Sequence, residues 1–270
     1  MTSTSPTIWL IGGTQESAEL ANAIAHRQVP CLVTVTTDAA RSLYPTTPTL
    51  QVRVGALHRE QAETLLRTYH IGCILDASHP FAVEISTLAI ALAQHYHLPY
   101  LRYERPVLAS PSFVQTLNSP LHLISWQALL TDNYLAGQRV LLTIGYKNLA
   151  LFHAWHDRAC LFARILPSTV ALEAALQAGF TSDRLIALRP PYTAALERAL
   201  WQQWQITKVV TKASGSAGGE DIKYQIAAEL GVQLIVIDRP AIAYPCQTSD
   251  FQTALSFCDT LGTAYPPTPS

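Results

Sequence analysis

The segment TIWLIGGTQESAELANAIAHR, Thr7–Arg27, indicates the fold class. Its first five residues, Thr7–Ile11, are apolar or β-branched and predict a buried strand. The apolar residues of Ser17–Arg27 recur at helical spacing and predict an amphipathic helix. Because the turn Gly12–Thr14 joins the two directly, the backbone there must turn tightly and can approach an anion at the helix N-terminus.

The glycine turn supports two interpretations. The complete dinucleotide-binding fingerprint is G-x-G-x-x-G, and in this chain Thr14 and Ser17 stand at the later glycine positions. The turn is therefore either a nucleotide-binding loop formed by Gly12, Gly13 and Thr14 or a plain connection between strand and helix.

Short apolar runs alternate with helix-period segments along most of the chain, which is the pattern of a parallel α/β architecture. In the first half we expect further strands at Cys31–Thr36, Leu50–Val54, Cys73–Asp76 and Pro99–Tyr103, and helices at Arg59–Thr68 and Ala82–Tyr96. In the second half we expect strands at Leu121–Ser125, Arg139–Ile144, Leu161–Ile165, Arg184–Leu188, Lys208–Thr211 and Gln233–Asp238. Helices are expected there at Asn148–Trp155, Thr169–Ala178, Tyr192–Trp201 and Glu220–Leu230, with a last helix within Ala254–Pro267.

A segment rich in Pro, Ser and Asn between Pro106 and Pro120 separates the two series. We therefore place a domain boundary near residue 108, with a five-stranded doubly wound domain at 1–108 and a second α/β domain at 109–270. Two parallel-sheet lobes of this kind usually bind a ligand in the cleft between them, at the carboxyl ends of the strands.

The composition excludes several classes of protein. Hydrophobic residues make up 49% of the 270 residues and charged residues 14%, so the chain is a folded globule with a large core rather than a disordered polyelectrolyte. A net charge of −1 provides no field that would attract nucleic acid or an anionic membrane. The longest apolar stretch, Ile85–Ala93, is too short to span a bilayer. The N-terminus lacks a secretory signal, so we expect a cytoplasmic protein.

The residues after the second predicted strand bear on cofactor choice. Asp38 can bind a ribose 2′-hydroxyl, as acidic residues do in NAD sites. Alternatively, Arg41 with the hydroxyls of Thr36 and Thr37 can hold a 2′-phosphate, because guanidinium and hydroxyl donors match phosphate oxygens.

The segment Asp76–Ala82, DASHPFA, follows a strand that reads as buried. It places a carboxylate, a hydroxyl and an imidazole, on Asp76, Ser78 and His79, close to the start of a helix. Helix capping would account for Asp76 or Ser78 but does not require His79 as well. Loops at the carboxyl ends of strands commonly carry functional residues, so we expect a site here.

Two arginines flank a glutamate at the end of the fifth predicted strand. One of Arg102 and Arg105 can pair with Glu104, which would leave the other for a carboxylate or phosphate. The alternative is a solvated ion network.

Lysine is scarce in this chain, and its four positions are Lys147, Lys208, Lys212 and Lys223. Two of these flank the glycine-rich loop TKASGSAGGEDIK, 211–223, which leaves a strand and opens a helix. Backbone N–H groups and two ammonium groups can converge there on an anion. The loop is not a Walker A motif, which disfavours kinase or ATPase chemistry.

Other signals are weaker. Gly145, Tyr146 and Lys147 repeat the order of strand, glycine and helix, and Arg164 ends a strand. His153 and His156 have no third ligand near in sequence, and the five cysteines form no C-x-x-C pair, so we expect no metal site. The chain lacks the G-x-S-x-G elbow of serine hydrolases.

Taken in order, five segments resemble the precorrin-6A reductase family of cobalamin biosynthesis. They are Ile11–Thr14, Asp76–Ala82, Leu101–Pro106, the loop Lys212–Gly219 with Lys223, and Asp238–Pro240. The resemblance implies two Rossmann-like lobes with the active site between them, residues 1–108 binding the dinucleotide and 109–270 completing the substrate site. It also implies that NADPH or NADH reduces one double bond of the precorrin-6A macrocycle, giving the 6B form, with a cobalt-containing substrate in the anaerobic branch.

The resemblance also implies site residues. The cofactor is expected to contact Gly12, Gly13, Thr14, Thr36, Thr37, Arg41, Asp76, Ser78 and His79. The acetate and propionate groups of the ring are expected to meet Arg102, Glu104, Arg105, Lys212, Ser214, Gly215, Gly218, Gly219 and Lys223. The catalytic proton donor is unknown, with His79 and Tyr146 as candidates.

Two segments depart from the family pattern. Ala40 stands where a glycine is common, and Asp38 puts a negative charge near the place of a 2′-phosphate, so the choice between NADPH and NADH stays open. Arg189–Thr193 carries two prolines and no glycine. The alternatives are another nucleotide-dependent α/β reductase and a non-enzymatic protein that binds a tetrapyrrole or nucleotide. The sequence does not indicate the oligomeric state.

Overall fold

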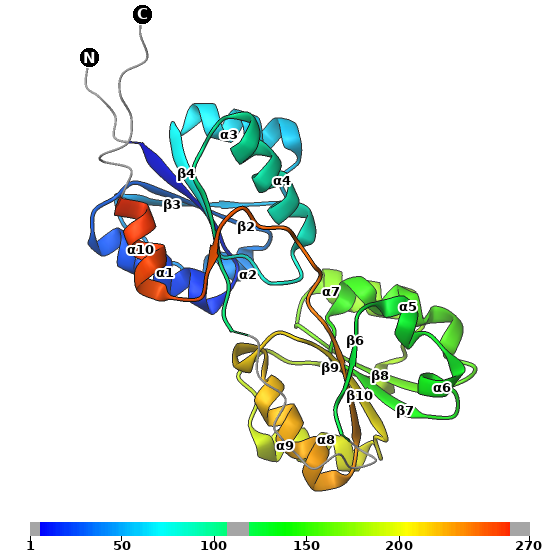
Figure 1. Ribbon diagram of the computed structural model, residues 1–270. Coiled ribbons are helices and arrows are strands. Elements are labelled where there is room, and N and C mark those ends of the chain that lie inside the picture. Colours follow the sequence, from blue (N-terminus) through cyan, green and yellow to red (C-terminus); the bar gives the residue numbers. More distant parts are fainter. Residues whose placement is uncertain (1–5, 107–118, 260–270) are drawn as a thin grey trace, which may run out of the picture. The chain divides into compact units, whose positions relative to one another are not determined.

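The computed structural model describes residues 6–106 and 119–259. Its contacts divide the chain into two compact units. The first unit is Met1–Pro106 with Pro240–Ser270, and the second is Val107–Arg239. Each unit contains one six-stranded parallel sheet with helices packed on it (Figure 1). The α/β class with parallel sheets is therefore confirmed.

The sheet of the first unit has the strand order β12-β5-β4-β1-β2-β3. Its strands are β1 (Thr7–Ile11), β2 (Cys31–Val35), β3 (Leu50–Val54), β4 (Ile71–Asp76), β5 (Tyr100–Tyr103) and β12 (Gln247–Thr248). The helices are α1 (Gln15–His26), α2 (Asp38–Arg41), α3 (Arg59–Thr68), α4 (Val83–His95) and α10 (Phe251–Asp259). Strands β1, β2 and β4 are buried along their length or nearly so, as expected for parallel strands covered on both faces.

Neighbouring residues of β1 point to opposite faces of this sheet. Ile8 and Leu10 belong to the core beneath α1 and α10, whereas Trp9 and Ile11 belong to the core beneath α3 and α4. This alternation follows from the twofold period of a strand. It explains why the continuous apolar run Ile8–Ile11 is needed there.

The C-terminal residues return to the first unit. β12 pairs in parallel with β5, with Gln247 opposite Arg102, and α10 packs beside α1. There, Arg27 Nη1 donates to Asp259 Oδ2 (2.7 Å) and to the carbonyl of Leu255 (3.1 Å). We expected residues 109–270 to form one domain, but the residues from Pro240 onward belong to the first unit. The sheet of this unit, expected to have five strands, has six.

The sheet of the second unit has the order β6-β11-β10-β7-β8-β9. Its strands are β6 (Leu121–Leu123), β7 (Arg139–Leu142), β8 (Cys160–Ile165), β9 (Leu185–Ala187), β10 (Lys208–Lys212) and β11 (Gln233–Ile237). Its helices are α5 (Trp126–Leu129), α6 (Asp132–Leu135), η1 (Tyr146–Trp155), α7 (Thr169–Gln177), η2 (Ser182–Arg184), α8 (Ala194–Gln203), η3 (Ser216–Gly218) and α9 (Glu220–Leu230). α8 and α9 share one core with residues of β7, β8, β10 and β11.

All six strands expected in this unit are confirmed, with ends shifted by one or two residues. The helix expected at Asn148–Trp155 is a 3₁₀ helix, η1, that starts two residues earlier. The last helix, expected within Ala254–Pro267, begins at Phe251, and residues 260–267 lie outside the described part. Along 6–106 and 119–259, no helix is long and apolar enough to cross a membrane, and no cluster of three or more metal-binding side chains occurs.

The return of the C-terminus can be tested by truncating a buried side chain of α10. Leu255 is 3% exposed in the core of the first unit. We expect Leu255→Ala to lower the free energy of unfolding by about 2–4 kcal/mol, because it leaves a cavity. Amide hydrogen exchange should show lost protection in α1 and unchanged protection in α9. The control is Leu172→Ala, on the exposed side of α7. Equal loss of protection in α1 and α9 would contradict the assignment.

Candidate functional site

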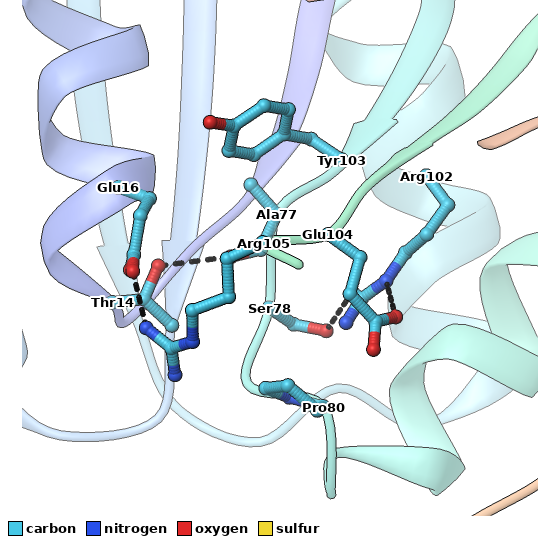
Figure 2. Close-up of a pocket in the computed structure, with 9 residues that line it drawn as sticks. All are labelled: Thr14, Glu16, Ala77, Ser78, Pro80, Arg102, Tyr103, Glu104 and Arg105. Carbon is cyan, nitrogen blue, oxygen red and sulfur yellow. Dashed lines mark hydrogen bonds and ion pairs between the residues drawn. The ribbon is translucent and has the colours of Figure 1, made fainter. Parts of the chain in front are cut away.

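Segments that follow β1, β4 and β5 meet at the carboxyl edge of the first sheet. They line a small pocket of about 10 Å³ (Figure 2), formed by Thr14, Glu16, Ala77, Ser78, Pro80, Arg102, Tyr103, Glu104 and Arg105. Such a volume accommodates about one water molecule. Predicted site residues from three separate stretches of sequence are therefore brought together here.

Thr14 and Ser17 explain why the glycine fingerprint is incomplete. Thr14 Oγ1 accepts a hydrogen bond from Ser17 N–H (3.1 Å), and Ser17 Oγ accepts one from Thr14 N–H (3.0 Å). This capping box stabilises the start of α1. Thr14 Oγ1 also donates to the carbonyl of Ala77 (3.1 Å), which ties the loop after β1 to the loop after β4.

Tyr44 covers the glycine turn. Its hydroxyl accepts a hydrogen bond from Gly13 N–H (2.7 Å) and lies 2.6 Å from Ser17 Oγ. A Cβ atom on Gly12 would collide with this hydroxyl and would lie 3.1 Å from Tyr44 Cζ. Gly13 has a φ of 105°, which side chains rarely tolerate. Both glycines are therefore required by the local structure, and the phenol occupies one N–H donor of the turn.

Asp76 is the centre of a buried hydrogen-bond network. Its Oδ1 accepts bonds from Arg102 Nη1 (2.9 Å) and Ser78 N–H (3.0 Å), and its Oδ2 from Ser86 Oγ (2.6 Å) and Tyr100 Oη (2.8 Å). The pKa of Tyr100 is raised by burial and by the adjacent carboxylate. The side chains of Asp76 and Arg102 are fully buried. Asp76 therefore positions its neighbours, and the expectation that it contacts a cofactor is not supported by this geometry.

Arg102 in β5 and Arg105 just after β5 are both in ion pairs. Arg102 Nε donates to Glu104 Oε2 (2.9 Å), and its Nη1 donates to Ser78 Oγ (3.0 Å). Arg105 pairs with Glu16 (Figure 2). Both arginines are therefore paired within the first unit, and the contact of either one with a ligand stays a prediction. Of the described buried polar atoms, Arg102 Nη2 is one for which no hydrogen-bond partner is found.

His79 follows this network and is half-buried. Its Nδ1 accepts a hydrogen bond from Phe81 N–H (3.2 Å), so the neutral ring carries its proton on Nε2. Tyr146, the other candidate proton donor, is the first residue of η1 in the second unit. The two candidates therefore belong to different units.

A larger pocket of about 580 Å³ is lined by α2, by the segment that follows it and by the first residues of β3. Its lining includes Asp38, Arg41 and Tyr44, so it adjoins the glycine turn through the phenol. Thr37 caps α2 by accepting a hydrogen bond from Ala40 N–H (3.2 Å), and Thr36 is exposed. Asp38, the alternative for a ribose hydroxyl, and Arg41, the alternative for a 2′-phosphate, line the same pocket.

The glycine-rich loop after β10 is held by two charged side chains of α9. Glu220 Oε2 accepts a hydrogen bond from Gly215 N–H (2.7 Å). Lys223 Nζ donates to the carbonyls of Gly218 (2.7 Å) and Gly219 (3.2 Å). A Cβ atom on Gly218 would lie 2.7 Å from Ser214 Cβ. The loop's close packing therefore requires this glycine.

Lys223 is 1% exposed, and burial lowers its pKa to about 8. Its ammonium group holds the carbonyls of the loop, and its contact with the substrate stays a prediction. Burial and the nearby charge of Lys147 lower the pKa of Lys212 to about 8. Lys212 ends β10, and Lys147 follows the neighbouring strand β7. These two lysines therefore form a positive pair at the carboxyl edge of the second sheet.

Sequence reasoning missed three residues that shape the two edges. Tyr44 lies in a segment with no periodic pattern. The position of Glu220 in the first turn of a helix after a glycine loop, where acidic residues are favourable, could have identified it. Glu16 was similarly placed in the first turn of α1. The first-turn position of the two glutamates was visible in the sequence. Their partners, Arg105 and the Gly215 N–H, come from distant or folded segments and were not.

The two parallel sheets and the glycine turns at their carboxyl edges place the chain among Rossmann-like α/β proteins. A model of the family described as precorrin-6x reductase CbiJ/CobK matches residues 7–259. The chain belongs to this family, and it is an oxidoreductase.

Individual relatives agree with this assignment. A Synechocystis protein named cobalt-precorrin-6A reductase is 48% identical over 252 residues, which cover 93% of this chain and 95% of the relative. A Priestia megaterium protein of the same name is 33% identical over 91% of this chain and 95% of its own length. A solved structure described as CobK precorrin-6A reductase superposes with a TM-score of 0.73 at 24% identity, covering 95% of this chain and 97% of that one. It supports the fold.

The contact between Tyr44 and the glycine turn can be measured with a double-mutant cycle. We expect Gly12→Ala to lower the free energy of unfolding by about 1–3 kcal/mol, because the added methyl group collides with the Tyr44 hydroxyl. Tyr44→Phe removes that hydroxyl and should recover part of the loss in the double variant. Tyr96→Phe serves as the matched control. Additive losses in the double variant would show that the two residues do not interact.

Proposed function

We propose that the protein reduces one double bond of precorrin-6A, or of its cobalt-containing form, to the 6B form with a hydride from a reduced nicotinamide dinucleotide. The observation that carries this proposal is the 48% identity to a cobalt-precorrin-6A reductase over 93% of the chain. The match extends through both sheets, so it includes the edges at which the predicted site residues lie.

The first unit fits a dinucleotide. The Gly13 N–H is bonded to the neutral Tyr44 hydroxyl, which a phosphate oxygen can replace, and the adjoining pocket of about 580 Å³ carries Arg41. The acidic residue of an NAD site usually ends the second strand, but β2 ends at Val35 and is followed by Thr36. Asp38 comes later, within α2. Arg41 therefore favours NADPH, with its guanidinium on the 2′-phosphate. The bound nicotinamide supplies the hydride.

The second unit is proposed to meet the acetate and propionate groups of the macrocycle. Lys212 is the favoured contact, because Lys147 lies near enough to repel its charge and a carboxylate between them would relieve this repulsion. Lys223, Arg102 and Arg105 already have carbonyl or carboxylate partners. Their proposed roles are therefore to hold the loops on which the binding groups lie.

The proposal is tested by following reduced-nicotinamide absorbance in the presence of precorrin-6A and its cobalt form. The expected result is oxidation of the cofactor that depends on the macrocycle, with a product heavier by two hydrogen atoms. If neither macrocycle causes oxidation with NADPH or NADH, the proposed function is wrong.

Arg41 should determine cofactor choice. We expect Arg41→Ala to lower kcat/KM for NADPH by about 10–100-fold, the loss of one charge-assisted contact, and to leave the value for NADH nearly unchanged. Arg67→Ala, at the end of α3, is the control for loss of a positive charge. An equal decrease for both cofactors would remove Arg41 from this role.

Lys212 should make substrate capture pH-dependent. Its lowered pKa of about 8 means that the ammonium is present below that pH and is lost above it. We expect kcat/KM for the macrocycle to fall as pH rises through about 8, and Lys212→Arg to move this fall to higher pH. Lys208→Met is the control, because Lys208 lies at the other end of β10. An unchanged profile in Lys212→Arg would contradict the assignment.

A further inference from the structure

The hydroxyl of Tyr44 is bonded to the glycine turn after β1. It accepts the N–H of Gly13 (2.7 Å) and lies 2.6 Å from Ser17 Oγ. Tyr44 is 8% exposed and belongs to the core beneath α1 and α10. Burial raises the pKa of Tyr44, so the phenol is neutral at pH 7. A neutral hydroxyl is therefore held where the proposed dinucleotide meets the turn.

The hydrogen bonds of Ser17 assign the direction of its contact with Tyr44. Ser17 Oγ donates to the carbonyl of Thr14 (2.7 Å) and accepts the N–H of Thr14 (3.0 Å). A serine hydroxyl has one hydrogen to donate, so the hydrogen between Ser17 and Tyr44 comes from the phenol. Tyr44 therefore accepts from the glycine turn and donates to the first turn of α1.

A phosphate oxygen fits the position of this hydroxyl. It would receive the N–H of Gly13 and, once the Ser17 hydroxyl rotates away from the Thr14 carbonyl, a second hydrogen bond from Ser17. The Thr14 carbonyl keeps a partner after this rotation, because it also accepts the N–H of Ala18 (3.2 Å). A charged oxygen accepts hydrogen bonds more strongly than a phenol does, so it can take over both donors.

The hydroxyl and a phosphate oxygen exclude each other at this position. The phenol lies against Gly12, where an added Cβ atom would collide with the Tyr44 hydroxyl and would lie 3.1 Å from Val33 Cγ1. The N–H of Gly13 is a single donor, and an oxygen bonded to it at 2.7 Å leaves no space for another. One of the two acceptors must therefore move away when the other binds.

The pocket of about 580 Å³ gives Tyr44 space to move. Tyr44 lines it together with Arg41, and the N–H of Tyr44 donates to the carbonyl of Arg41 (3.1 Å). Hydrogen-bonded oxygens lie about 3 Å apart, so a movement of the hydroxyl by about that distance toward the pocket vacates its position. The group that faces the pyrophosphate thus belongs to the same turn as Arg41, which is proposed to hold the 2′-phosphate.

We propose, on the basis of the proposed function, that the Tyr44 hydroxyl is an internal competitor of the dinucleotide pyrophosphate. In the free protein it is bonded to Gly13 and Ser17. In the complex a phosphate oxygen takes its place, and Ser17 becomes a phosphate ligand. A ligand that must shift a protein away from its favoured state binds with reduced affinity. Tyr44 therefore sets the affinity for either cofactor, whereas Arg41 sets the choice between them.

Calorimetric titration of the full-length protein with the oxidised cofactors NADP⁺ and NAD⁺ tests this competition. Tyr44→Phe keeps the ring and removes the hydroxyl. We expect its Kd to fall about 3–10-fold for both cofactors, the equivalent of one net hydrogen bond, because no contact of the free protein has to be broken. Adenosine 2′-monophosphate, which lacks the pyrophosphate, should bind the variant and the unmodified protein equally. Tyr96→Phe, at the end of α4, is the matched control.

Ser17→Ala separates the two roles that Ser17 can have. As a phosphate ligand, Ser17 should be needed for binding, so this variant should bind NADP⁺ and NAD⁺ about 10-fold more weakly, also when it is combined with Tyr44→Phe. If Ser17 only anchored Tyr44, its loss would strengthen binding instead, which would contradict the proposal. Ser168→Ala, which removes the N-cap of α7 in the second unit, is the control for loss of a helix-capping hydroxyl.

Three results with Tyr44→Phe would overturn the proposal. A Kd that is unchanged or higher would show that the hydroxyl stays in place or contacts the dinucleotide. A lower Kd for NADP⁺ alone, or for adenosine 2′-monophosphate as well, would place the effect at the 2′-phosphate or the adenosine. In each case the unmodified protein still binds a dinucleotide, so the proposed function stands. If the unmodified protein binds neither dinucleotide and oxidises neither reduced cofactor with the macrocycle, the proposed function fails, and the competition fails with it.

Discussion

The buried ion pair between Asp76 and Arg102 is the interaction on which the first site depends. It joins the ends of β4 and β5 and fixes Ser78 through both partners. The backbone N–H of Arg102 donates to the carbonyl of Cys246 (2.9 Å), and its guanidinium lies 5.2 Å from the ring of Tyr244. The returning C-terminal segment is therefore attached to the same residue. Loss of either charge would leave the other buried and unpaired, which costs about 3–5 kcal/mol.

The second unit uses its charges in a similar way. Glu220 and Lys223 come from one turn of α9 and satisfy, respectively, an N–H and two carbonyls of the glycine-rich loop. Buried backbone groups need partners, and a loop with several glycines has few side chains of its own to provide them. Two of the chain's few charged residues are therefore used to fix the backbone of this loop. Lys223, which the sequence offers as a ligand contact, therefore supports the loop backbone in this structure.

The sequence predicted the elements better than the contacts of the site. Strands β1 and β3 and helices α3 and α9 were located to the residue, because apolar periodicity depends on local sequence. β12 was missed because a strand of two residues is too short to show an alternating apolar pattern. The return of the C-terminus to the first sheet was missed for the same reason. The sequence singled out Lys223 and Arg102, but it did not predict their burial or their partners inside the fold, since a sequence pattern does not show whether a cation points into the core.

The position of Glu220 separates the chemistry of the two glycine loops. A phosphate at Gly215 N–H would face the Glu220 carboxylate that already accepts this bond, and like charges at this distance repel. At the first loop, Gly13 N–H is paired with a neutral phenol, which an anion can displace without repulsion. The proposed dinucleotide therefore fits the first loop better than the second. An anion at the second edge must approach the ammonium groups of Lys212 and Lys147, which suits the separate carboxylates of a macrocycle.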